Sequence, residues 1–268
     1  GAARMKREFD LSPGVSAIGR ILRQNGLTRR PKRKHQTKKD LRAVKAQYPP
    51  LRRFQMDVKY LNALPHYWPY YRQPGYPRYQ YTTRCVRLGA TFLAYADEIS
   101  VTYAELTARR LLKHLERYGI DPQEVQIQTD RGSEFDGQAT RKDGQGFTHT
   151  IEQEFGAHHR LLLKANPNAN ADVESFHHHE EREFFDIEDF RSPADFWEKI
   201  TTYQDYWNIG RPNSYKGWRT PLEILRQADP FLKPQALLLP PLWLPTLLPA
   251  PQGGHDVPNR SQTETESP

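Results

Sequence analysis

The sequence predicts an α/β fold in which a mixed sheet of five strands is flanked by helices. Three consecutive segments, 54–61, 79–86 and 90–99, have the alternating or continuous apolar patterns of β-strands. After them, helix-like and strand-like segments alternate along the chain, an order typical of a mixed sheet with helices packed on it. The length of 268 residues is sufficient for one such core together with flanking segments.

The first element that the pattern predicts is a helix within residues 11–27. Ser12 is a suitable N-cap, Pro13 suits the first helical position, and Gly26 suits the C-terminal stop. We expect this segment to be the second helix of a partial helix-turn-helix over residues 1–27, and a plain amphipathic helix is the alternative. Its apolar stripe comprises Val15, Ile18, Ile21 and Leu22.

Positive charge is concentrated in residues 28–46, which hold nine Lys or Arg residues and one Asp. The formal net charge of the whole chain is +7, so the remainder is close to neutral. A block of like charge repels itself and is suited to a phosphate backbone, although a solubilising linker or a localisation signal has the same composition. We expect a basic linker over residues 28–50. The candidate DNA contacts in these two segments are Arg20, Arg23, Arg29, Arg30, Lys32, Arg33, Lys34, Lys38 and Lys39.

The strand at residues 54–61 has two chemically different faces, with Asp57 and Lys59 on one and four apolar side chains on the other. Further strands are expected at residues 124–130 and 158–163. Helices are expected at residues 103–118, 147–155, 172–185, 192–208 and 221–227. These elements divide into a core at 51–190, a helical extension at 191–230 and a Pro-rich, largely disordered tail at 231–268.

Composition excludes several classes of protein. The single cysteine, Cys85, rules out an internal disulfide framework and any zinc site that needs two thiolates. No apolar run reaches the ~18 residues that a membrane span requires, so we expect no membrane association. The N-terminus has no apolar signal segment.

Three acidic residues lie within or at the ends of predicted strands and a predicted helix, where they could bind a metal ion. Asp57 lies inside the first strand, Asp130 closes the fourth, and Glu174 begins the helix after the last strand. Two acids on adjacent strands would repel each other unless a cation lay between them, and hard cations such as Mg²⁺ take oxygen ligands. Two such ions can assist phosphodiester chemistry by activating one oxygen and stabilising the other. Ordinary surface acids remain the alternative at this point, because the chain has 32 acidic residues.

Four stretches of the sequence resemble a known family in the right order. They read FQMDVKYL at 54–61, IQTDRGSEF at 127–135, KANPNANADVESFH at 164–177 and NIGRPNSYKGWRTPLEIL at 208–225. In these stretches the chain resembles the integrase-type transposases, the DDE group that includes bacterial insertion-sequence transposases and retroviral integrases. The resemblance spans most of the chain and implies a ribonuclease-H-like core.

The resemblance assigns roles to particular residues. Asp57, Asp130 and Glu174 would be the catalytic, metal-binding triad for two Mg²⁺ ions, with Mn²⁺ able to substitute. Glu134 is commonly present in the family without belonging to the triad, so we leave it out. Further candidate DNA contacts are Lys164, Asn168, Asn170 and Lys59, and for Lys59 a solvated lysine beside an acid is the alternative.

Two other features allow more than one interpretation. Residues 177–179 are three consecutive histidines, which do not share a helix face and therefore do not suit zinc. His177 is instead a candidate for contact with DNA or with a substrate phosphate near the metal ions. Residues 60–81 carry seven tyrosines and Trp68. Such aromatic side chains stack on unpaired bases in some proteins and pack on the core or on another subunit in others.

The activity that the resemblance implies is transposition. The protein would cut double-stranded DNA at transposon ends and join the exposed 3′-hydroxyl to target DNA, acting as a homo-oligomer in the bacterial cytoplasm at the nucleoid. One alternative is a catalytically idle or truncated transposase that only binds DNA. Another is a ribonuclease-H-like nuclease that only hydrolyses.

Overall fold

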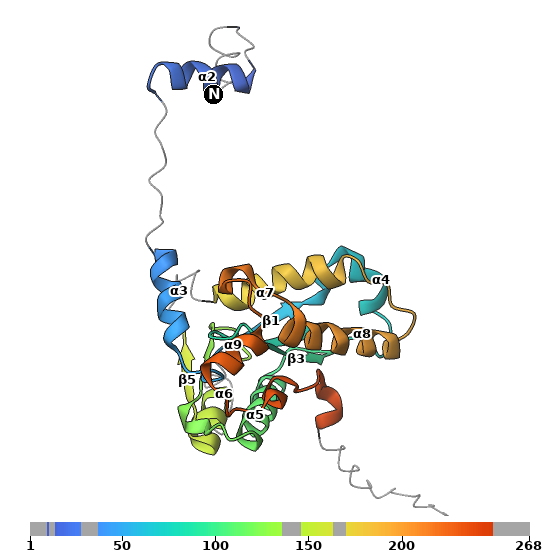
Figure 1. The fold of residues 1–268 in the computed structure, drawn as a ribbon. Coiled ribbons are helices and arrows are strands. Elements are labelled where there is room, and N and C mark those ends of the chain that lie inside the picture. The colour runs from blue at the N-terminus through green and yellow to red at the C-terminus, as the bar shows by residue number, and fades with distance from the viewer. Residues whose placement is uncertain (1–9, 11–13, 28–36, 136–145, 163–169, 249–268) are drawn as a thin grey trace, which may run out of the picture. The chain divides into compact units, whose positions relative to one another are not determined.

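The computed structural model describes residues 10, 14–27, 37–135, 146–162 and 170–248 (Figure 1). The chain divides into two compact units, residues 1–44 and residues 45–268. Within the described residues, no helix has both the length and the apolar character that crossing a membrane requires.

The first unit contains helix α2 (Val15–Gln24), which follows the N-cap residue Gly14. The helix ends as expected, because Gly26 takes the left-handed conformation with φ of 66°. Ser12 and Pro13 lie outside the described residues, and the helix-turn-helix stays a prediction. Helix α3 (Thr37–Gln47) occupies the later part of the expected basic linker, where no Gly or Pro interrupts the chain.

The second unit is built on a six-stranded mixed sheet with the order β5-β4-β1-β2-β3-β6. Strands β1, β2 and β3 pair antiparallel, whereas β4 is parallel to β1, β5 to β4 and β6 to β3. The strands are β1 (Arg53–Tyr60), β2 (Tyr79–Cys85), β3 (Thr91–Ala96), β4 (Gln126–Thr129), β5 (His158–Leu161) and β6 (Leu242–Trp243). The expected mixed sheet is confirmed, with a sixth, two-residue strand at its edge.

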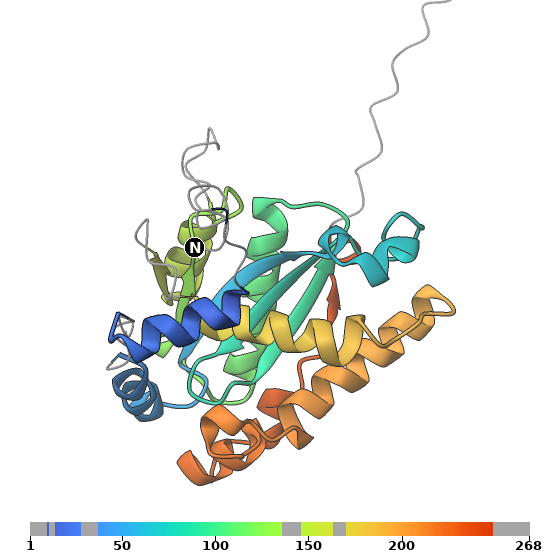
Figure 2. The ribbon, with the colours of Figure 1, turned by 90° about the horizontal axis from the view of Figure 1, so that it is seen from above.

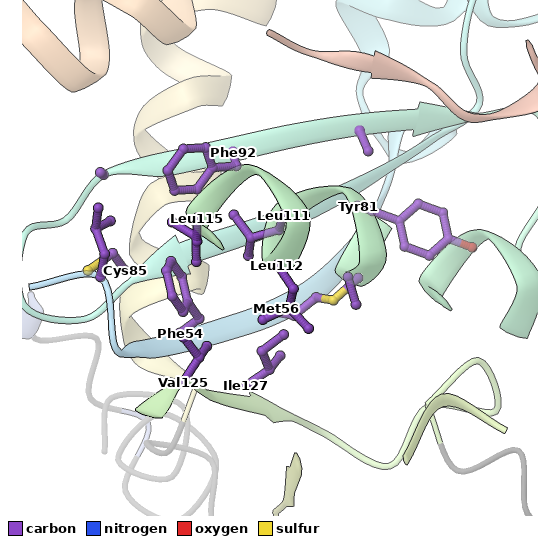
Figure 3. Close-up of a cluster of buried hydrophobic side chains, with 14 of the residues drawn as sticks. Phe54, Met56, Tyr81, Cys85, Phe92, Leu111, Leu112, Leu115, Val125 and Ile127 are labelled. Atoms are coloured by element: carbon purple, nitrogen blue, oxygen red, sulfur yellow. The ribbon is translucent and has the colours of Figure 1, made fainter. Parts of the chain in front are cut away.

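Helix α5 (Val101–Arg117) covers one face of the sheet (Figure 3). Its N-cap is Ser100, whose side chain accepts a hydrogen bond from the main-chain N–H of Tyr103. Leu111, Leu112 and Leu115 of the helix pack with the apolar face of β1 in one hydrophobic core. The alternation expected for β1 is therefore confirmed on this face.

Helices α7 (Ala171–Glu180) and α8 (Pro193–Asp205) cover the opposite face (Figure 2). A second core lies between these helices and the sheet, with Leu93 and Tyr95 of β3 packed against Phe176 and Phe196. Both helices continue as π-helical turns, at Glu181–Phe185 and Tyr206–Gly210. The shorter helices are α4 (Trp68–Tyr71), α6 (Phe147–His149) and α9 (Pro221–Ala228).

Most of the aromatic loop at residues 60–81 belongs to this second core. Tyr67 is 1% exposed, and its ring contacts those of Phe185 and Phe196. Burial of several aromatic rings in contact favours packing over base stacking for this part of the loop. Tyr60 and Trp68 differ from Tyr67, with 52% and 56% of their surfaces exposed.

The segment 231–248 corrects the expectation of a largely disordered tail. Leu237 and Leu244 are fully buried, and β6 pairs with the edge of the sheet through Leu242 opposite Ala94. Pro234 and Pro245 lie in short 3₁₀ turns, where a missing N–H is tolerated, and Pro240 and Pro241 directly precede β6. Residues 249–268 lie outside the described residues.

Candidate active site

The strand pairing brings Asp57 and Asp130 side by side. Gln55 of β1 lies opposite Gln128 of β4 in a parallel pair. Two residues further along each strand stand Asp57 and Asp130, the latter directly after the end of β4. The charge of Asp130 acts on Asp57, so the two carboxylates lie near each other beyond the end of this pairing.

Glu174 reaches the same place from helix α7. It lies in the first turn of the helix, which crosses the face of the sheet that carries Asp57. Asp130 and Glu174 are exposed to solvent, whereas the side chain of Asp57 is 24% exposed. The structure therefore groups the three acids that the sequence predicted, one from each of three elements.

The proximity of the acids is visible in the electrostatics of Asp57. The pKa of Asp57 is raised to about 7, first by burial and then by the negative charges of Asp130, Glu174 and Glu134. A hydrogen bond from the main-chain N–H of Val58 opposes the shift in this pKa. A cation bound among carboxylates of this kind would reduce the repulsion between their charges.

Glu134, which the resemblance leaves out of the triad, also lies close to Asp57. Its side chain is half-buried, burial raises its pKa, and its charge acts on Asp57. It follows Asp130 in a tight turn in which the N–H of Gly132 donates a hydrogen bond to Oδ1 of Asp130 at 2.9 Å. Glu134 is therefore a fourth carboxylate beside the predicted triad.

The donor set fits a hard divalent cation in its chemistry. All the candidate ligand atoms are carboxylate oxygens, which Mg²⁺ prefers. Among the described residues, no positive charge acts on Asp57 strongly enough to keep its pKa low. Among the described residues, no group of three or more His, Cys, Asp or Glu side chains stands ready-formed as a metal site. The carboxylates are therefore neighbours, but they do not converge on a common metal position.

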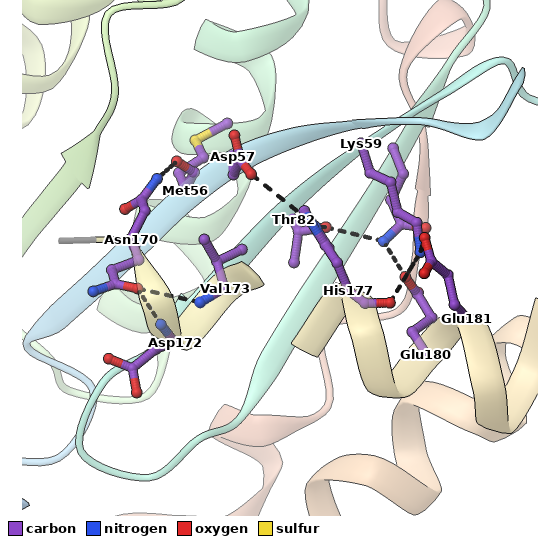
Figure 4. A network of polar contacts seen from close by, with 12 residues as sticks. Met56, Asp57, Lys59, Thr82, Asn170, Asp172, Val173, His177, Glu180 and Glu181 are labelled. Carbon is purple, nitrogen blue, oxygen red and sulfur yellow. Dashed lines mark hydrogen bonds and ion pairs between the residues drawn. The ribbon is translucent and has the colours of Figure 1, made fainter. Parts of the chain in front are cut away.

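His177 is a close neighbour of Asp57, and its role as a DNA contact stays a hypothesis. Its ring is mostly buried, with Nδ1 3.7 Å from Oδ2 of Asp57 and Nε2 2.9 Å from Oγ1 of Thr82 (Figure 4). The pKa of His177 is lowered to about 3, first by burial and then by the positive charges of Lys59 and Arg84. The imidazole is therefore neutral at physiological pH. Its position three residues after Glu174, on the same helix face, was the available signal.

Lys59 and Asn170, two predicted DNA contacts, are buried within the protein. The ammonium of Lys59 lies 3.3 Å from Oε2 of Glu180 and 3.6 Å from Oε1 of Glu181. The amide of Asn170 donates to the carbonyl oxygen of Met56 at 3.5 Å. Both side chains are less than 10% exposed, so we do not carry either forward as a DNA contact.

The structure describes only some of the remaining candidate DNA contacts. Arg20 and Arg23 are exposed on α2. Lys38 and Lys39 belong to α3, with side chains outside what the structure describes. The others lie outside the described residues: Arg29, Arg30, Lys32, Arg33, Lys34, Lys164 and Asn168.

The second unit has an α/β fold, with one mixed sheet between layers of helices. Three antiparallel strands, β1 to β3, are followed by the parallel strands β4 and β5 on the other side of β1, with helices on both faces. This arrangement agrees with the fold class that the sequence predicted.

Two solved structures with similar folds are integrase structures. The catalytic core domain of BIV integrase is 16% identical, with a TM-score of 0.43 over 67% of this chain and 96% of that one. A chain of the simian T-cell lymphotropic virus intasome, solved in complex with PP2A regulatory subunit B56 gamma, is 14% identical, with a TM-score of 0.46 over 66% of this chain and 54% of that one. No protein-family model matches the sequence, and no curated protein is significantly similar to it. Likenesses at this level define no activity for the chain.

Proposed function

We propose that the protein is a DNA transposase of the DDE integrase type, a metal-dependent polynucleotidyl transferase. The observation that supports this best is the grouping of Asp57, Asp130 and Glu174 from a strand, a strand end and a helix, with electrostatic coupling to Asp57. An acidic side chain whose pKa is raised to near neutral pH by burial and like charges is typical of a functional site.

Asp57, Asp130 and Glu174 would hold two Mg²⁺ ions, for which Mn²⁺ substitutes. When bound, such ions activate the attacking oxygen and stabilise the leaving oxygen of a phosphodiester exchange. Asp57 contributes as a carboxylate that loses its proton near pH 7. The neutral ring of His177 adds no positive charge beside it, so the negative potential of the site is preserved.

The proposed reaction has two steps that need no covalent enzyme intermediate. Water first cuts one strand at a transposon end and leaves a 3′-hydroxyl. That hydroxyl then attacks a phosphodiester of target DNA and forms the joining bond, while the target's own 3′-oxygen is displaced from the phosphorus and leaves as a hydroxyl. The residues of the chain position the scissile phosphate at the acidic cluster and hold the DNA on either side of it.

DNA is the proposed partner, both at the element ends and at the target. Arg20 and Arg23 on α2 and the basic residues of the linker would bind its phosphates, together with Lys164 and Asn168. Cutting and joining two ends at one target requires more than one copy of the chain, so we propose a homo-oligomer on DNA. The setting that the sequence motifs favour is a bacterial nucleoid.

A DNA-binding protein without catalytic activity is the second candidate, because no ready-formed metal site exists among the described residues. An end-cleavage assay separates the two. A labelled duplex carrying the terminal sequence of the host element is incubated with the chain and Mg²⁺ or Mn²⁺, beside an Asp130→Asn variant. Metal-dependent cutting that the variant lacks is the result expected of a transposase. Tight binding of the same duplex without cutting in either metal would support the DNA-binding protein.

A further inference from the structure

Strand β1 contacts helix α7 at both ends of the helix. Gln55, Asp57 and Lys59 are alternate residues of the strand and therefore share one face of the sheet. Gln55 contacts the first turn of α7, and Lys59 contacts its last turn. Between these two contacts lies Asp57, level with His177 (Figure 4).

The contact at the start of the helix is a cap supplied by another element. Oε1 of Gln55 accepts hydrogen bonds from the main-chain N–H groups of Asp172 at 3.0 Å and Val173 at 3.2 Å. These N–H groups have no partner within a helix, and the residue at the N-cap position, Asn170, makes no capping bond with its side chain. The cap that the sequence of α7 does not provide therefore comes from β1.

The contact at the other end is made by charge. Nζ of Lys59 donates to the carbonyl oxygen of His177 at 3.1 Å and to Oε2 of Glu180 at 3.3 Å. Both side chains are buried, so the loss of either one would leave the other charge buried without its partner and would destabilise the protein. Lys59 thus attaches the last turn of α7 to the strand that carries Asp57.

The two contacts are about equally far apart along the strand and along the helix. Four residues of strand, from Gln55 to Lys59, extend about 13 Å at a rise of about 3.3 Å per residue. Eight residues of helix, from Asp172 to Glu180, extend about 12 Å at 1.5 Å per residue. The strand and the helix therefore run in the same direction with their contacts in register, and sliding α7 along β1 would break the contacts at both ends.

We propose that Gln55 is a positioning residue for the acidic site. Its two hydrogen bonds hold the main chain at Asp172 and Val173, directly before Glu174, and so set the height of Glu174 relative to Asp57 on the same strand. Gln55 itself need not touch metal or DNA. The proposal rests on the proposed function only in assigning Glu174 to the metal site, because the cap itself is a property of the fold.

The test uses the full chain and two variants. Gln55→Leu removes the acceptor with little change in size, and Gln55→Glu retains an acceptor oxygen that a helix N-terminus favours. Amide hydrogen exchange at Asp172 and Val173 reports the cap, and the electron paramagnetic resonance of Mn²⁺ titrated alone reports the metal site. Gln55→Asn, in which the amide is one methylene shorter, serves as the loss variant if the Leu variant does not fold.

We expect Gln55→Leu to speed exchange at both amides by roughly tenfold, since each lost hydrogen bond has a modest net value. We also expect the dissociation constant of Mn²⁺ to rise by about 10- to 100-fold, as for residues that orient metal ligands. Gln55→Glu should retain the slow exchange. Unchanged exchange in Gln55→Leu, or fast exchange with unchanged Mn²⁺ binding, would overturn the proposal. Absence of Mn²⁺ binding in the wild type would instead refute the metal site, while the exchange data would still test the cap.

Discussion

Lys59 of β1 and Glu180 of α7 form a buried ion pair, with 3.3 Å between Nζ and Oε2 and both side chains less than 10% exposed. Burial raises the pKa of Glu180, and the positive charge of Lys59 together with a hydrogen bond from Gln80 opposes that shift. The pair joins the strand that carries Asp57 to the helix that carries Glu174. It therefore connects the stability of the fold to the geometry of the site.

Replacing Lys59 with Met should destabilise the protein by about 3–5 kcal/mol, because the carboxylate of Glu180 would remain buried without its cation. Urea unfolding measures this change. The double variant Lys59→Met/Glu180→Leu, which removes both charges, should regain most of the stability. A Lys59→Met variant with wild-type stability but weaker DNA binding would show that Lys59 contacts DNA after all.

The raised pKa of Asp57 predicts a specific dependence of stability on pH. Because the folded carboxyl keeps its proton up to about pH 7 and the unfolded one loses it near 3.8, the folded state binds more protons between these values. Stability of the metal-free protein should therefore fall as pH rises from 4 to 7. Asp57→Asn should remove this loss and be more stable than wild type at pH 8 by about 2–4 kcal/mol.

Thermal unfolding of wild type and Asp57→Asn without metal, from pH 4 to pH 8, checks this prediction. Mg²⁺ should stabilise the wild type at pH 8 more than at pH 5, since binding requires the ionised carboxylate. Equal stability of the two proteins at pH 8 would mean that Asp57 is ionised without cost in the folded state.

Glu174 and Glu134 offer a matched pair, because both carboxylates act on Asp57 but only Glu174 comes from α7. Glu174→Gln should lower the rate of end cleavage by at least about 100-fold, since a ligand of the metal site is lost. Glu134→Gln should stay within about tenfold of wild type. The rates are measured with saturating DNA and Mn²⁺, and the opposite order would assign the third metal ligand to Glu134.

The basic linker predicts how DNA binding depends on salt. Each phosphate contact contributes about 0.9 to the slope of log K against log salt concentration. Lys38→Gln/Lys39→Gln should therefore reduce the steepness of that slope by about 2, whereas Lys113→Gln, an exposed lysine on α5, should leave it unchanged. Fluorescence anisotropy of a labelled duplex at several salt concentrations gives the slopes. Equal slopes for all three proteins would exclude Lys38 and Lys39 from contact with DNA phosphates.

The apolar pattern of β1 was sufficient to predict its face against α5, because alternation in sequence becomes alternation in space. The opposite face could not be predicted in the same way. Gln55 and Lys59 are polar, yet α7 covers them and makes them buried partners of the helix. Their burial depends on an element more than a hundred residues away, and polarity alone therefore suggested a solvated face.

The three acids of the proposed triad were identified by motif. Their proximity in space depends on the fold and could not be predicted from the motifs. The sequence does not state that β4 pairs with β1, or that Gln55 lies opposite Gln128, which is what aligns Asp57 with Asp130. The segment around Leu237 and Leu244 was misjudged for a related reason. Its prolines were weighed as local signals of disorder, whereas its leucines are held by the edge of the sheet and the core.

A strand-transfer assay tests the central claim most directly. Pre-cut ends of the host element are incubated with a supercoiled target plasmid and Mg²⁺ or Mn²⁺, with wild type and Asp130→Asn in parallel. The account predicts a joined product that requires the metal and disappears in the variant. Tight, salt-dependent binding of the ends without any joined product in either metal would contradict it.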